Sequence, residues 1–118
     1  MPIVILSAGR NEHILKARNR ALTAAGFDVV SCDESGVVEE LFEGRFDAVV
    51  LCHSRREDER RRLAGIIKSY CSSTPVIVVS DLQGRKFDYG TLTVSNYPAE
   101  IIAAVRQLVA QQTRPQVA

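Results

Sequence analysis

The stretch Arg45-Phe46-Asp47-Ala48-Val49-Val50-Leu51-Cys52 contains the most apolar run of the chain, from Ala48 to Cys52. This run is short, continuous and rich in β-branched residues, which is typical of a strand buried on both faces of a parallel sheet. Comparable runs lie at residues 3–6, 29–32, 76–79 and 91–94. Because helical patterns separate most of these runs, the sequence predicts an α/β domain with a parallel sheet covered on both faces.

The segments between the strands are predicted to form amphipathic helices. The first begins at a cap on Asn11 and stops near Gly26, a second is closed by Gly44, and the last begins at Pro98. The residues expected to face the core are Ile14, Leu15, Ala21, Leu22 and Ala25; then Val38, Leu41 and Phe42; then Leu63, Ile66, Ile67, Tyr70 and Cys71; and finally Ile101, Ile102, Val105, Leu108 and Val109. Residues 81–90 show no helical stripe, so a helix there is expected to be short or absent.

Length and composition indicate one globular domain. The chain has 118 residues, of which 46% are hydrophobic and 25% charged, and this is enough apolar material for one core. We expect the domain to span residues 1–112 and residues 113–118 to form a disordered tail. The three cysteines are odd in number and form no C-x-x-C pair, and the sequence begins without the pattern of a secretory signal. Both features predict a cytoplasmic protein.

The charge pattern argues against nucleic-acid and membrane partners. The formal net charge is only +1, which gives no strong field for a phosphate backbone or an anionic membrane. The segment Arg55–Arg62 mixes arginines with acids and contains no aromatic residue, which is typical of a solvated helix start. No apolar stretch has the length of a membrane span.

Four stretches in order resemble the receiver domain of bacterial response regulators. They are Ala25-Gly26-Phe27-Asp28-Val29-Val30-Ser31-Cys32-Asp33-Glu34-Ser35, the Arg45–Cys52 stretch, Thr74-Pro75-Val76-Ile77-Val78-Val79-Ser80, and Pro98-Ala99-Glu100-Ile101-Ile102. Together they cover about residues 2 to 110. The resemblance implies a doubly wound, CheY-like (flavodoxin-like) sheet of five parallel strands in the order 2-1-3-4-5. It also places the functional site at the carboxyl ends of the strands.

The positions that carry the family's phosphorylation chemistry differ here. Ser7 and Ala8 stand where receivers place two acidic residues that hold magnesium. Cys52 stands at the phosphoacceptor aspartate, and Val94 or Ser95, depending on a one-residue gap, stands at the lysine. Only the switch hydroxyl, Ser80, remains.

These losses predict a pocket that does not accept a phosphoryl group. Magnesium requires oxygen ligands, mostly carboxylates, and the hydroxyl and methyl of Ser7 and Ala8 cannot replace two of them. A thiol at Cys52 is a poor acceptor, and the phosphoryl charge would lack both metal and lysine. We therefore expect no bound metal, no cofactor and no enzymatic activity. The interpretation is a degenerate pseudo-receiver in two-component signalling that binds a protein partner, either another signalling protein or a second copy of itself.

Two other functions remain open at this point. Cys52, near Arg10, His53 and Arg55, can be a reactive thiol in a redox or ligand sensor that uses the vacated pocket. The simpler interpretation of this cysteine is a small buried residue that replaces aspartate. Alternatively, the chain is a true phosphoacceptor with relocated acidic residues.

The candidate residues for those alternatives lie at strand ends. Asp33 and Asp81 are the carboxylates that can relocate a magnesium site. His13, Cys32, Cys52 and His53 are zinc ligand types, but they lack the paired spacing of zinc sites, so none is predicted.

Overall fold

The computed structural model describes residues 3–9, 12–33, 36–51, 57–71, 73–80, 89–95 and 97–113. Its elements are, in order, β1 (Val4–Ala8), α1 (Glu12–Ala24), β2 (Asp28–Cys32), α2 (Val37–Glu43), β3 (Ala48–Leu51), α3 (Glu57–Tyr70), β4 (Val76–Ser80), β5 (Leu92–Ser95) and α4 (Pro98–Thr113). The strands form one parallel sheet in the order β2-β1-β3-β4-β5. The predicted fold class and strand order are confirmed.

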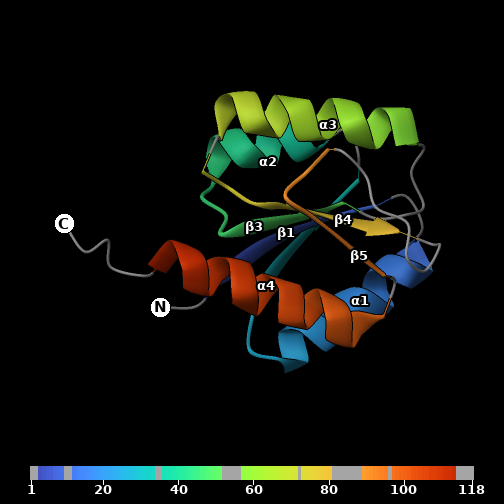
Figure 1. Cartoon of the computed structure of the whole chain (residues 1–118). Helices are drawn as coiled ribbons and strands as arrows, with labels where there is room; N and C mark the ends of the chain where they lie inside the picture. The colour runs from blue at the N-terminus through green and yellow to red at the C-terminus, as the bar shows by residue number, and fades with distance from the viewer. Residues whose placement is uncertain are drawn as a thin grey trace.

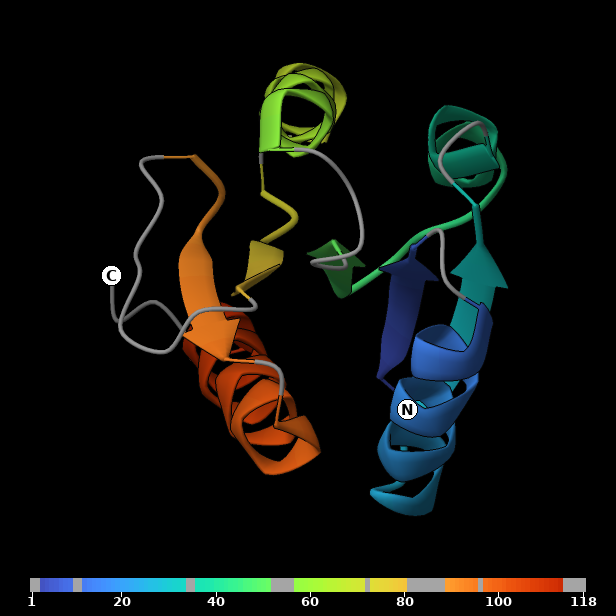
Figure 2. The ribbon, with the colours of Figure 1, turned by 90° about the vertical axis from the view of Figure 1, so that its right-hand side faces the viewer.

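Helices cover both faces of this sheet. In Figures 1 and 2, α2 and α3 lie on one side, and α1 and α4 lie on the other. Since neighbouring residues of a strand point to opposite faces, each central strand contributes to both layers. Val50 belongs to the cluster under α1 and α4, whereas Val49 and Leu51 belong to the cluster under α2 and α3. The run that identified β3 in the sequence is therefore buried from both sides, as predicted.

The end of α1 shows why Gly26 stands where the helix stops. Gly26 has a φ of +99°, in the left-handed region that favours glycine. Its N–H donates to the Thr23 carbonyl (3.0 Å), and the Phe27 N–H donates to the Leu22 carbonyl (3.2 Å). Both Leu22 and Phe27 are buried in the same cluster. This is a Schellman motif with its hydrophobic contact, and it directs the chain into β2.

Two predicted core residues are at the surface. Phe42 and Tyr70 were expected to face the sheet, but their side chains are 70% and 67% exposed. Each ring lies in the last turn of its helix, and the two rings pack against each other with centroids 5.5 Å apart. The helical stripe is interrupted there because an aromatic contact between α2 and α3 replaces contact with the sheet.

The described part of the segment before β5 leaves one face of that strand without a covering helix. Residues 89–91, which the structure describes, form no helix, and no helix of the described part covers β5 on the α3 side (Figure 2). The rest of this segment, residues 81–88, lies outside the described residues, as do residues 114–118 of the expected tail. Among the described residues, no helix is both long and apolar enough to span a membrane.

Candidate functional site

The carboxyl ends of the strands are the first candidate site, because parallel pairing brings them to one edge. Ala8 is the register partner of both Cys32 on β2 and Leu51 on β3. Ser80 on β4 is the register partner of Ser95 on β5. The structure thus brings together the described members of the predicted pocket. Other candidates there, namely Arg10, Cys52, His53, Arg55 and Asp81, lie outside the described residues.

Ser7 and Ala8, which the sequence resemblance aligns with the acidic pair, point to opposite faces of the sheet. Ala8 is fully buried in the cluster under α2 and α3. Ser7 is fully buried too, but strand alternation turns it to the other side with Ile5, which packs under α1 and α4. Among the described residues, the Ser7 hydroxyl has no hydrogen-bond partner. An isolated hydroxyl and a methyl on different faces offer no shared position for a cation.

Val94 and Ser95, the two candidates on β5, point to opposite faces of the sheet. Val94 packs against the cluster under α1 and α4, so it points away from Ser80. Ser95 follows it and faces the α3 side, as Ser80 does. The Ser95 hydroxyl accepts a hydrogen bond from the Tyr97 N–H at 3.4 Å. Of the two candidates, Ser95 is therefore the one that shares the α3 side with Ser80, and its hydroxyl takes part in a local turn.

An arginine at this edge was missed by the sequence analysis. Arg60 of α3 is only 5% exposed, and its Nη1 donates to the Val79 carbonyl at 2.6 Å. The contact holds the carboxyl end of β4 against α3, directly beside Ser80. The sequence analysis interpreted the arginine run as solvated, although the helical spacing of Arg60 already indicated a buried position. Arg60 lies three and seven residues before the buried Leu63 and Ile67, on the same helical stripe.

Carboxylates do not gather at the described part of this edge. Asp33, the relocation candidate within the described residues, is exposed and accepts a hydrogen bond from the Gly36 N–H at 3.2 Å. Of the zinc-type residues that are described, His13 is exposed on α1 and Cys32 is half-buried at the end of β2. Across the described residues, no group of three or more His, Cys, Asp or Glu side chains can hold a metal ion.

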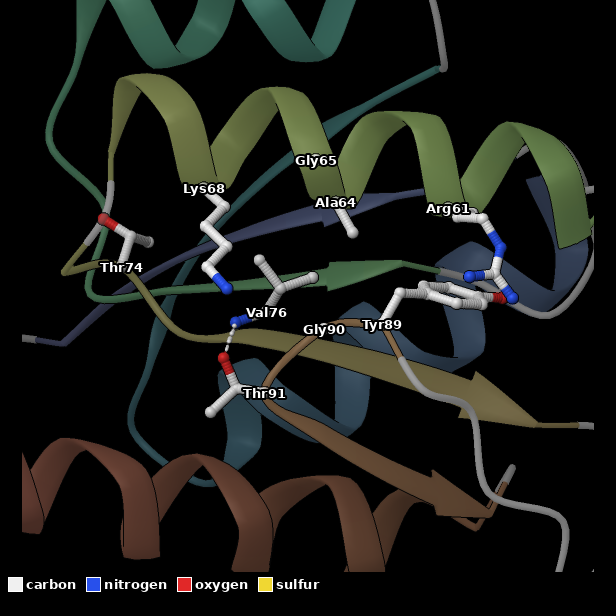
Figure 3. Close-up of a pocket in the computed structure, with 9 residues that line it drawn as sticks. All are labelled: Arg61, Ala64, Gly65, Lys68, Thr74, Val76, Tyr89, Gly90 and Thr91. Atoms are coloured by element: carbon white, nitrogen blue, oxygen red, sulfur yellow. Dashed lines mark hydrogen bonds between the residues drawn. The ribbon is translucent and has the colours of Figure 1, made fainter.

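A second candidate site lies between α3 and the edge of the sheet. We call it the α3–β5 cavity. It has a volume of about 370 Å³ and is lined by Arg61, Ala64, Gly65, Lys68, Thr74, Val76, Tyr89, Gly90 and Thr91. Figure 3 shows Arg61 and Lys68 extending from α3 toward the strands, with Tyr89 and Thr91 on the opposite wall. The sequence predicted that a helix at residues 81–90 is short or absent, but it gave no sign of a cavity.

Several solved structures that superpose on this chain are receiver domains. A CheY-like response regulator receiver domain from Methanospirillum hungatei JF-1 superposes with a TM-score of 0.81 at 11% identity, covering 95% of this chain and 97% of that chain. The signal receiver domain of an HD domain-containing protein from Pseudomonas fluorescens Pf-5 gives 0.81 at 19% identity, with 98% and 94% coverage.

A third match is a chain from the complex of histidine kinase ThkA with response regulator protein TrrA. It gives a TM-score of 0.79 at 17% identity, covering 90% of this chain and 97% of that chain. No protein-family model and no curated protein sequence matches the chain. The chain has the fold of response regulator receiver domains, at identities that establish the fold alone.

Proposed function

We propose that this chain is a receiver-like signalling module that recognises a protein partner in a single state, without phosphoryl transfer and without a reaction of its own. The observation that carries the proposal is the arrangement of Ser7 and Ala8. The sequence resemblance aligns these residues with the metal-binding acids, and both are buried, on opposite faces of the sheet. Without carboxylates at that place, a phosphoryl group has no metal to offset its charge.

The contact between Arg60 and Val79 supports a single state. A switching receiver needs two arrangements of the region around its switch hydroxyl, and a ligand must favour one of them. Here the backbone next to Ser80 accepts a buried hydrogen bond from Arg60. Releasing that carbonyl inside the protein costs about 1–3 kcal/mol, which favours the observed arrangement.

The partner is proposed to be a signalling protein or a second copy of the chain. One structural neighbour comes from a complex between a histidine kinase and a response regulator. The proposed contact surface includes α4 and the segment 81–90, by analogy with the output face of receivers. Tyr97, just before α4, is 66% exposed, and exposed tyrosines are enriched at protein interfaces.

The experiment is incubation of the whole protein with acetyl phosphate and Mg²⁺, followed by intact mass spectrometry. We expect no phosphoryl adduct, while a phosphorylatable receiver treated in parallel gains one. An adduct that disappears in Cys52→Ser would identify the thiol as the acceptor. An adduct lost in Asp33→Asn or Asp81→Asn would identify a relocated carboxylate. Any of these adducts overturns the proposal.

Thiol reactivity separates the redox sensor from the binding module. We expect Cys52 to react with iodoacetamide no faster than Cys32 and Cys71, since we interpret Cys52 from the sequence as a small hydrophobic replacement for aspartate. Peptide mapping of the alkylated protein measures all three rates in one sample. A Cys52 rate far above the other two would favour the redox sensor instead.

A further inference from the structure

We propose that the α3–β5 cavity binds a small organic oxyanion, a carboxylate or phosphate monoester attached to a planar apolar group. This inference concerns a site separate from the phosphorylation pocket, and it does not depend on the proposed function. The cavity volume of about 370 Å³ lies within the range of small-molecule sites, which is roughly 300–1,000 Å³.

The charge of the lining is the first argument. Arg61 and Lys68 both belong to the lining, and the described lining residues include no carboxylate. Lys68 forms no ion pair or hydrogen bond with any described residue, so its ammonium group is available to a ligand. The two residues are two helical turns apart, about 10 Å along α3. Figure 3 shows their side chains reaching toward the strands at the two ends of the cavity, so a ligand between them meets positive charge from both.

The middle of the cavity is apolar, which argues for an organic ligand. Ala64 and Val76 are buried lining residues, and the Tyr89 ring adds an aromatic surface. The guanidinium carbon of Arg61 lies 4.9 Å from the centroid of that ring. This cation–π contact positions Arg61 at the cavity wall before any ligand arrives. A planar group against these surfaces buries apolar area, which inorganic phosphate cannot do.

Gly65 keeps the helix side of the cavity open. It lies inside α3, where glycine is less favourable than alanine by about 1 kcal/mol. A Cβ atom added at Gly65 would meet nothing within 4 Å, so no neighbour forces glycine at this position. The missing side chain leaves space between Arg61 and Lys68.

The opposite wall is held in place by the start of β4. The Thr91 N–H donates to the Val76 carbonyl (2.7 Å), and the Val76 N–H donates to Thr91 Oγ1 (2.9 Å). Between Tyr89 and Thr91, Gly90 has a φ of +80°, and an added Cβ would come within 2.6 Å of Val78 Cγ2. A wall fixed in this way is preformed, which lowers the entropic cost of binding.

The test uses phenyl phosphate as the probe and the full chain at constant ionic strength. Calorimetry and amide NMR shifts of Gly65 and Thr91 follow the titration. We expect saturable binding with a dissociation constant of about 1 mM or below, and no saturation by phenol or inorganic phosphate. Benzoate is titrated in parallel: equal binding assigns the site to oxyanions in general, and weaker binding assigns it to phosphate monoesters.

Variants distinguish binding of phenyl phosphate in the cavity from its general electrostatic attraction to the basic helix α3. Arg61→Gln and Lys68→Gln should each weaken phenyl phosphate binding by about tenfold. Gly65→Leu should abolish it by filling the cavity. The matched control is Arg62→Gln, which removes an exposed arginine of α3 outside the lining and should leave the affinity unchanged. Circular dichroism confirms that each variant is folded.

Three results would overturn the proposal. The first is that the wild-type protein shows no saturation up to about ten times the expected dissociation constant. The second is an equal loss of affinity in Arg62→Gln and Arg61→Gln. The third is full affinity in a folded Gly65→Leu protein. The phosphodonor experiment is unaffected by any of them, so the two proposals fail separately.

Discussion

Ser7 and Ala8 at the carboxyl edge of the sheet and the lining of the α3–β5 cavity lie in the same small domain, yet they differ in charge and in burial. At the carboxyl edge, Ser7 and Ala8 are small, uncharged and fully buried. In the cavity, Arg61 and Lys68 line an open volume without a described carboxylate. The comparison teaches that the backbone fold determines which positions lie close together, whereas the side chains at those positions determine whether an ion can bind there.

Two consecutive arginines of α3 show how small the structural difference is. Arg60 points inward and donates to the Val79 carbonyl, so its hydrogen-bonding capacity is directed at the protein itself. Arg61 is rotated by about 100° around the helix, is exposed, and lies over Tyr89 in the cavity wall. Residues of the same type therefore have a structural role at one site and a proposed binding role at the other.

The largest expected effect is at the cavity wall. Gly90→Ala combines a left-handed backbone with a Cβ within 2.6 Å of Val78 Cγ2. We expect the free energy of unfolding to fall by roughly 2–4 kcal/mol, from backbone strain and overpacking together. Urea unfolding measures it. A change below the experimental error would mean that the wall is not held in the described conformation.

A smaller loss is expected at the carboxyl edge. Arg60→Met keeps a long apolar side chain but leaves the buried Val79 carbonyl without its hydrogen bond. The free energy of unfolding should fall by about 1–3 kcal/mol. Arg62→Met is the control, because Arg62 is exposed on the same helix and should change stability little. Equal stability of the two variants would contradict the proposed role of Arg60.

Gly26→Ala separates backbone strain from steric contact. Gly26 also has a positive φ, but a Cβ added there meets nothing within 4 Å. We expect a loss of about 1–2 kcal/mol in the free energy of unfolding, from the left-handed conformation alone. Chemical denaturation of both glycine variants in the same buffer gives the difference from Gly90→Ala, which is the cost of the contact with Val78. A larger loss at Gly26 than at Gly90 would be inconsistent with the packing around Gly90.

The smallest effect has the opposite sign. Gly65→Ala should raise the free energy of unfolding by roughly 0.5–1 kcal/mol, since alanine is the better helix former and its methyl group has free space. The thermal midpoint should rise accordingly. A loss of stability would show that the space beside Gly65 is smaller than described.

The fold was predictable because its signals are local and repeated. The apolar runs at β1, β3 and β4 each indicate a strand, and the glycine after α1 indicates where that helix ends. The receiver-like spacing gave the strand order. Phe42 and Tyr70 were misplaced because helical periodicity cannot tell where a helix stops contacting the sheet.

The sites were less predictable because they depend on contacts between distant residues. Arg60 and Val79 are nineteen residues apart. The cavity combines α3 with residues 74–76 and 89–91, and no local pattern connects these segments. Ser7, Ala8, Ser80 and the pair Val94 or Ser95 were proposed through a family resemblance, and their side-chain directions required the structure.

The most direct test of the account is an amide NMR spectrum recorded before and after addition of acetyl phosphate and Mg²⁺. We predict one set of resonances that stays in place at Ala8, Ser80 and Ser95, because in the proposed single state a phosphoryl group makes no differential contact with these residues. New or shifted resonances at these three residues, developing with phosphodonor and absent with Mg²⁺ alone, would contradict the single-state account.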